Sequence, residues 1–178
     1  MTIRALLLVL LAVGWWRVPA ATGGAAPQRA LATGAGVVVA AMTVLALVSG
    51  PLLDALDVDT ETFRIATGLV ASAVGVARMW GWGSGREDDA ELAAPSGWAW
   101  PLAYPVLSGP LTVLAAVSVG SDHGVFAVLA AAVVGAVVTV ALGGRCVPRP
   151  VAVTAVRLVG ALLAVLGVAL IFDGLRDV

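Results

Sequence analysis

Prolines within apolar runs are the residues of this sequence whose type and spacing point most directly to chemistry. Pro105 and Pro110 interrupt one such run. Proline lacks an amide hydrogen and clashes with the preceding turn, so the two predict a helix that breaks partway along its length. In lipid, the backbone groups freed by a break must be satisfied by protein or by a water-filled cavity. The residues expected to line such a cavity are Tyr104, Pro105, Ser108, Gly109, Pro110 and Thr112.

The alternative for this segment is a kink that neighbouring helices close, with Gly109 allowing them to approach. Pro19 interrupts an apolar run near the start of the chain in the same way. This recurrence favours a solute-binding cavity over a simple kink. Pro19 is therefore a further candidate for the lining of the cavity.

Two arginines, Arg64 and Arg157, stand at the start of apolar stretches. A charge inside a membrane span is expensive, which makes each of them a candidate functional residue. Both lie near enough to the end of their stretch for the side chain to reach the interface. Two further interpretations stay open. One is contact with an anionic solute, and the other is structural pairing, of Arg64 with Asp54 or Glu61 and of Arg157 with freed carbonyl groups.

Other side chains with ligand or catalytic character do not group into a site. The acidic residues from Asp54 to Glu61 lack the glycine and the ligand order of a calcium loop. Asp122 and His123 form too small a set, and Cys146 has no second cysteine with which to form a disulfide. We therefore expect neither an enzyme nor a bound metal or cofactor.

The composition indicates which elements must position these residues. Hydrophobic residues make up 61% of the chain and charged residues 12%, with a mean hydropathy of +1.04. Charged residues alone are roughly a quarter of an ordinary globular protein. The expected surroundings are therefore the lipid bilayer, because a soluble chain needs a polar surface. A net charge of -1 without a basic cluster argues against nucleic acid as a partner.

Apolar runs long enough to cross a hydrocarbon core of about 30 Å, which takes about 20 residues, recur along the chain. They predict an all-α membrane protein in which residues 1–178 form a single domain with six transmembrane helices. The predicted spans are 4–23, 30–53, 63–82, 99–119, 124–143 and 151–172. The first run also fits a secretory signal, since Arg4 precedes it and Val18-Pro19-Ala20 fits a cleavage site. Six spans are preferred, because removing this run would leave five.

The placement of arginine predicts the orientation, because short cytoplasmic loops are enriched in basic residues. The opposite side of the predicted array carries an excess of acidic residues. The first, third and fifth connections hold Arg29, Arg86, Arg145 and Arg149. Both termini should therefore lie outside a bacterial inner membrane that the chain crosses several times.

The spans form two similar halves, at about 4–82 and 99–174. The third and sixth spans begin alike, since Arg64 and Arg157 are each followed by small residues. The first and fourth spans each hold an interrupting proline. Three spans per half is an odd number, so the halves must enter the membrane from opposite sides. Such inverted repeats are common among secondary transporters.

Three segments resemble the MarC family of six-span inner-membrane proteins. Gly50-Pro51-Leu52-Leu53 through Phe63-Arg64-Ile65-Ala66-Thr67-Gly68 is similar to the family's turn and F-R-I-A-G-G helix. The stretch from Pro101 to Pro110 is similar to its P-L-A-I-P-L-L-A-G-P motif, and that from Arg157 to Gly174 to its closing R-L-M-G and L-D-G. The first span departs from the family, because it lacks an Asn-Pro-x-Gly motif. The resemblance implies outside termini and a transporter related to the amino-acid exporter superfamily, without a settled substrate.

The expected function is transport or export of a small solute by alternating access, with a site where the broken first and fourth spans meet. The main alternative is a non-transporting membrane component that binds partner helices through Ala and Gly faces. A membrane-embedded enzyme is a less favoured alternative. The expected partners are the lipid bilayer and an unidentified small solute, and self-association of the chain stays open.

Overall fold

The described part of the chain folds into helices and holds no strand, as the apolar runs predict. The computed structural model describes residues 3–13, 28–81, 109–143 and 149–177. Its helices are α1 (Ile3–Ala12), α3 (Gln28–Leu56), α4 (Thr60–Met79), α6 (Pro110–His123), α7 (Val125–Gly143) and α8 (Arg149–Asp177).

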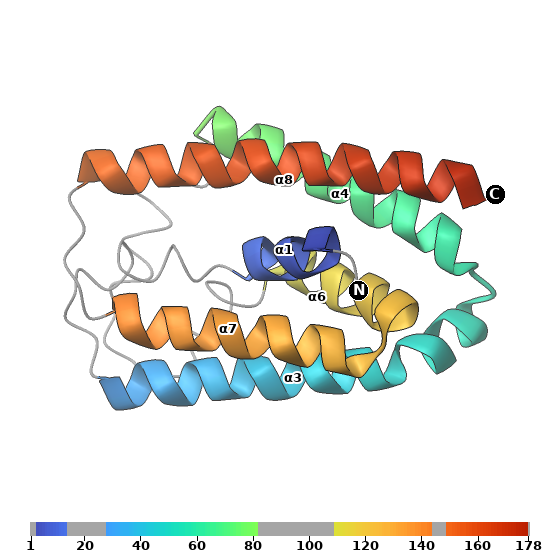
Figure 1. The fold of residues 1–178 in the computed structure, drawn as a ribbon, viewed down its shortest axis with the longest axis horizontal. Coiled ribbons are helices and arrows are strands. Elements are labelled where there is room, and N and C mark those ends of the chain that lie inside the picture. The colour runs from blue at the N-terminus through green and yellow to red at the C-terminus, as the bar shows by residue number, and fades with distance from the viewer. Residues whose placement is uncertain (1–2, 14–27, 82–108, 144–148, 178) are drawn as a thin grey trace.

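Two antiparallel helix pairs enclose the two shortest helices (Figure 1). α3 packs against α7 and α4 packs against α8, with α1 and α6 between these pairs. α1 and α4 begin, and α6 and α8 end, toward the same end of the bundle. This end is called the terminal end below. An even number of membrane crossings would place the start of α1 and the end of α8 in this way.

The two longest helices match predicted spans. α3 and α8 have 29 residues each, a length of about 43 Å at 1.5 Å per residue. By length and composition, their segments Leu31–Leu56 and Val153–Arg176 are the candidate membrane spans among the described residues, with mean hydropathies of 2.3 and 2.5. α4 and α7 coincide closely with the predicted spans 63–82 and 124–143, but α4 carries Glu61, Arg64 and Arg78 and is less apolar. Of the six predicted apolar spans, length and composition thus support two among the described residues, those of α3 and α8.

The predicted spans 4–23 and 99–119 differ most from what is observed. α1 has 10 residues and α6 has 14, or about 15 and 21 Å, and neither alone crosses a core of about 30 Å. α6 begins at Pro110, whose missing amide is harmless at a first helical position. It then continues past the predicted end to His123 and stops at Gly124, which has a φ of 78°.

Glycines let α4 and α8 meet backbone to backbone. A Cβ atom added to Gly68 would lie 2.6 Å from the carbonyl oxygen of Gly167, and one added to Gly75 would lie 2.6 Å from that of Gly160. The hydroxyl of Ser72 donates a hydrogen bond of 3.4 Å to the carbonyl of Ala164 across the same contact. Small residues allow such close packing where no hydrophobic effect drives helices together.

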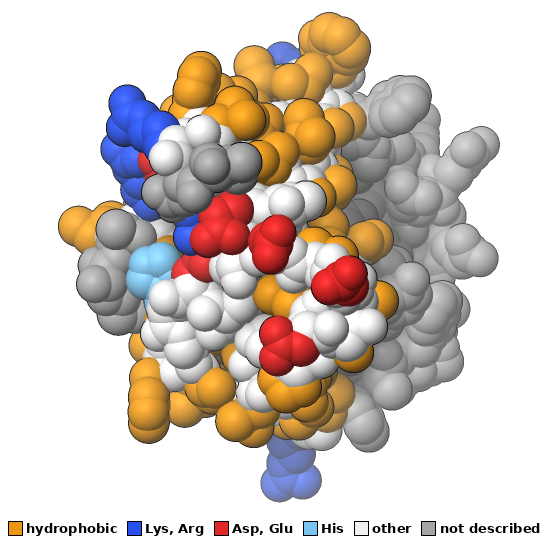
Figure 2. Space-filling model, turned by 90° about the vertical axis from the view of Figure 1, so that its right-hand side faces the viewer, with side chains coloured by type: hydrophobic (Ala, Val, Ile, Leu, Met, Phe, Trp, Pro, Cys, Tyr) orange, Lys and Arg blue, Asp and Glu red, His pale blue; other side chains and the backbone are white. Residues whose placement is uncertain are grey.

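Large apolar side chains cover the outside of the bundle. On α8, Leu158, Val165 and Phe172 are 62%, 67% and 62% exposed. Figure 2, which looks onto the terminal end, shows acidic and basic side chains gathered there and apolar side chains around the edge. An apolar outer surface with charges at the end fits a helical bundle in lipid.

Candidate functional site

The end of α1 meets the start of α6 between the two helix pairs. Thr112, which is 1% exposed, donates a hydrogen bond of 2.9 Å from its hydroxyl to the carbonyl oxygen of Ala12. The last carbonyl groups of a helix have no partner within that helix. Thr112 supplies one for α1 from a helix that lies 100 positions later in the chain. We call this contact the junction.

The predicted cavity residues lie around the junction only in part. Gly109 adopts an extended conformation with φ of -77° and ψ of 169° and caps α6, whose first residue is Pro110. Thr112 is buried, and its hydroxyl is engaged by the Ala12 carbonyl. The remaining candidates lie outside the described residues: Pro19, Tyr104, Pro105 and Ser108.

One small cavity lies beside the last residues of α1 in the described part of the chain. It has a volume of about 10 Å³ and is lined by Val13, Val38 and Thr139, among others. This volume is at the lower limit for a single water molecule. The hydroxyl of Thr139 donates a hydrogen bond of 2.8 Å to the carbonyl of Gly135 in its own helix, so it does not reach across the junction.

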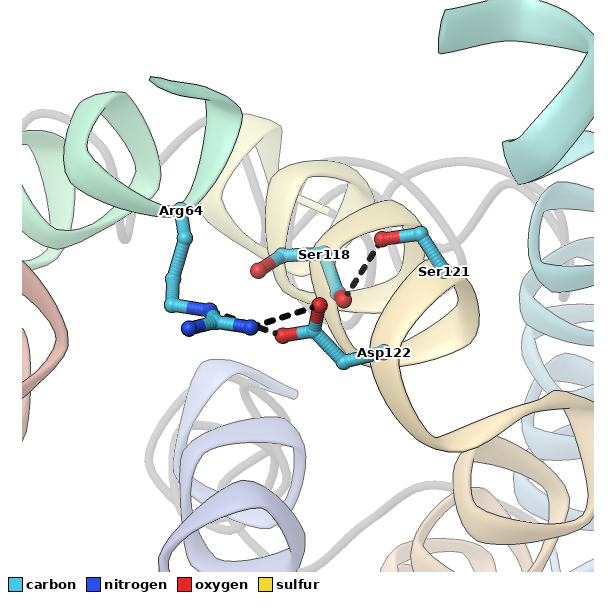
Figure 3. Close-up of polar contacts among 4 residues, drawn as sticks. All are labelled: Arg64, Ser118, Ser121 and Asp122. Atoms are coloured by element: carbon cyan, nitrogen blue, oxygen red, sulfur yellow. Dashed lines mark hydrogen bonds and ion pairs between the residues drawn. The ribbon is translucent and has the colours of Figure 1, made fainter. Parts of the chain in front are cut away.

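Arg64 forms a two-pronged ion pair with Asp122 (Figure 3). Its Nε donates to Oδ2 of Asp122 at 2.9 Å, and its NH2 group lies 2.9 Å from Oδ1. The two side chains are 16% and 10% exposed. Paired contacts of this geometry are among the stronger hydrogen bonds in proteins. Structural pairing of Arg64 is thus observed, with Asp122 as a partner that the sequence analysis did not name.

The face of α6 that carries Asp122 also carries Ser118, one helical turn earlier. Ser118 is 2% exposed and lies opposite the guanidinium of Arg64 (Figure 3). The hydroxyl of Ser121 donates a hydrogen bond of 2.9 Å to the carbonyl of Ser118. Of these contacts, the Arg64–Asp122 ion pair joins the last turn of α6 to α4.

Arg64 and Arg157 do not share a site. Arg64 lies at the terminal end, whereas Arg157 lies in the half of α8 that is nearer the opposite end. The side chain of Arg157 is exposed, and no ion pair joins it to another residue in the part of the chain that the structure describes. Its position fits a side chain that reaches the membrane interface.

An open pocket of about 350 Å³ lies at the terminal end between α1, α4, α6 and α8. A second ion pair crosses it, between NH1 of Arg4 and Oδ2 of Asp173 at 3.5 Å, with side chains 65% and 43% exposed. Apolar residues such as Leu170 form part of the wall. The charged or titratable residues of its lining are Arg4, Arg64, Asp122, His123, Asp173 and Arg176.

Sequence reasoning missed this pocket. The sequence analysis treats Asp122 and His123 as too small a set for a site and names Arg4 only as part of a possible secretory signal. The signal that could have found the pocket is the predicted topology itself. Six predicted crossings would bring Arg4, Asp122 and Arg176 to one side of the membrane. Among the described residues, no group of three His, Cys, Asp or Glu side chains could hold a metal ion.

The apolar outer surface, the charged end and the helix junction define the class to which the chain belongs, that of helical integral membrane proteins. More specifically, it belongs to the MarC family of integral membrane proteins, whose family model matches residues 21–178. This match confirms the resemblance to the MarC family that the motifs from Gly50 to Gly174 indicate. α1 lies before the matched residues. No curated protein and no solved structure matches the chain.

Proposed function

We propose that the chain carries a small solute across a bacterial inner membrane by alternating access between two inverted halves of three helices. The observation that carries this proposal is the junction, where Thr112 of α6 binds the last turn of α1 at 2.9 Å. Secondary transporters place their substrate sites where discontinuous helices of two repeats meet. Over their described residues, α1 and α6 are both too short to cross the membrane. α1 lies in the first of the two predicted halves and α6 in the second.

The contact between α4 and α8 supports the two-fold relation between the halves. Gly68 approaches Gly167 while Gly75 approaches Gly160. If Gly68 corresponds to Gly160 and Gly75 to Gly167, one position away from the register that pairs Arg64 with Arg157, the contact is reciprocal, as a two-fold axis requires. The same relation would pair α1 with α6 and α3 with α7. The contact between α3 and α6 then corresponds to the contact between α7 and α1, and both are observed.

The distribution of charge supports an orientation with both termini outside. α3 and α8 carry Arg29 and Arg149 in their first turns, at the end opposite the termini, and basic residues favour the cytoplasmic side. A reporter that is active only in the cytoplasm should therefore give a signal when fused at Gly85 and none when fused after Val178. The reverse pattern would reject this orientation.

The direct test of transport is solute flux in reconstituted vesicles, screened across amino acids and small metabolites. We expect the wild-type chain to move at least one of these solutes. Thr112→Val should reduce that flux, because it leaves the Ala12 carbonyl without its partner and disturbs the site. Thr139→Val is the matched control, since Thr139 is equally buried but binds within its own helix.

The control variant should retain the wild-type rate. If no solute moves with the wild-type chain, the proposal fails and the non-transporting membrane component replaces it. If Thr112→Val and Thr139→Val move solute equally well, transport survives but the junction is not its site.

A further inference from the structure

We propose that the pocket at the terminal end binds a small oxyanion, a carboxylate or a phosphate, held by Arg4 and Arg176. This site is distinct from the junction. Its existence does not depend on transport. Both arginines line the pocket, one from the first turn of α1 and the other from the last turn of α8.

The charge of the pocket favours an anion. Its lining holds three guanidinium groups and two carboxylates, with His123 as the remaining titratable group. Both oxygens of the Asp122 carboxylate are engaged by Arg64, at 2.9 Å each. That pair is mostly buried and forms a fixed, neutral part of the wall. The net charge of the pocket lining therefore depends on Arg4, Asp173 and Arg176.

Arg4 and Asp173 are only loosely paired. Their closest approach is 3.5 Å, longer than the roughly 2.7 to 2.9 Å of a charge-assisted hydrogen bond. Exposed pairs of this kind contribute little to stability, so Arg4 can exchange its partner at low cost. Arg176 is exposed, and no ion pair joins it to another described side chain. Two guanidinium groups thus face the pocket against one weakly held carboxylate.

The shape and the wall of the pocket suit such a ligand. A volume of about 350 Å³ accommodates a small metabolite. The guanidinium group presents paired N–H donors that match the two oxygens of a carboxylate or a phosphate. Apolar walls, including Leu170 and Val119, lower the local dielectric constant and strengthen the attraction. Figure 2 shows that charged side chains gather at the terminal end, and the charged residues of the lining are Arg4, Arg64, Asp122, Asp173 and Arg176.

The test is equilibrium binding of succinate and of inorganic phosphate to the full chain in nanodiscs of zwitterionic phosphatidylcholine. We expect saturable binding of at least one probe, and Arg4→Gln and Arg176→Gln should each weaken it about threefold to tenfold. Asp173→Asn should tighten binding, because it removes the carboxylate that competes with the anion for Arg4. Arg29→Gln, at the opposite end of the bundle, is the control of equal charge change and should bind as the wild type does.

Nanodiscs that contain phosphatidylglycerol separate the two sources of an oxyanion. If this lipid competes with the soluble probe, and does so through Arg4 and Arg176, the natural ligand is a lipid headgroup. If it does not compete, the ligand is a free solute. Melting temperatures without ligand confirm that each variant is folded, and both arginines are exposed enough to be replaced safely.

Absence of saturable binding together with absence of any phosphatidylglycerol effect would overturn the proposal. So would a loss of affinity in Arg29→Gln as large as that in Arg176→Gln, because binding would then follow net charge alone. Flux distinguishes this inference from the transport proposal. Anion binding without flux of any solute would refute transport only, whereas flux without anion binding would refute the oxyanion site only.

Discussion

The contact between α4 and α8 and the contact between α1 and α6 join helices in opposite ways. α4 and α8 approach so closely that Gly68 and Gly75 touch backbone atoms of the partner helix. α1 and α6 are joined across the junction by the Thr112 side chain, which binds the carbonyl of Ala12. The first contact is continuous along two long helices, and the second lies where two short helices end.

This difference suggests different roles for the two contacts, stability for the contact between α4 and α8 and, under the proposed function, transport for the junction. Backbone packing along α4 and α8 leaves no room for either helix to change register without losing many contacts. At the junction the Thr112 hydroxyl satisfies the Ala12 carbonyl, and backbone groups freed at a helix end are tolerated in a membrane only beside protein or water. We therefore expect substitutions in the first region to affect stability and those in the second to affect transport.

The largest loss of stability is expected from Gly75→Leu. A Cβ atom at this position would lie 2.5 Å from the amide nitrogen of Ala164 and 2.6 Å from the carbonyl oxygen of Gly160. The helices would have to separate, and the loss of stability should be about 3 kcal/mol or more. Gly36→Leu on α3 is the control, because nothing lies within 4 Å of its added Cβ. Melting temperatures in detergent should fall for Gly75→Leu alone; an equal change in both variants would mean that α4 and α8 are not closely packed.

A smaller loss of stability is expected when the ion pair between α4 and the end of α6 is broken. Arg64→Ala leaves Asp122, which is 10% exposed, without its cation and should destabilise the chain by about 2 to 3 kcal/mol. Arg157→Ala should cost less than about 0.5 kcal/mol, because that side chain is exposed.

The double variant Arg64→Ala/Asp122→Ala sharpens this prediction. Removing both charges should recover part of the stability that Arg64→Ala loses, since no unpaired charge remains. Thermal unfolding in detergent provides the measurement. Equal stability of Arg64→Ala and the wild type would show that the pair contributes nothing in solution.

Much of the fold could be predicted from the sequence because apolar runs report directly on helices in lipid. The long apolar runs at 30–53 and 151–172 correspond to α3 and α8, although both helices extend beyond them at each end. Hydropathy ends where polar residues begin, whereas a helix continues as long as its backbone hydrogen bonds do. Asp54 is an example, since it lies inside α3.

The candidate site was less predictable because its contacts join distant parts of the chain. Arg64 was assigned a partner among its neighbours in sequence, but tertiary packing gives it Asp122, 58 positions away. Arg4 and Arg176 stand near opposite ends of the chain and meet in one pocket only through the arrangement of α1 and α8. Thr112 is among the residues predicted to line a cavity, and its hydrogen bond to Ala12 of α1 has no signal in the sequence.

The measurement that tests the central claim most directly is the chemical accessibility of Ser108, two residues before the start of α6 and outside the described residues. In a chain with Cys146→Ser, the variant Ser108→Cys should react with a small polar thiol reagent in intact membranes, because a solute path at the junction must admit water. Leu129→Cys, within α7, should react slowly under the same conditions. A transported solute should protect Ser108→Cys from the reagent. If Ser108→Cys stays unlabelled from both sides of the membrane, no solute path passes the start of α6, and transport through the junction is contradicted.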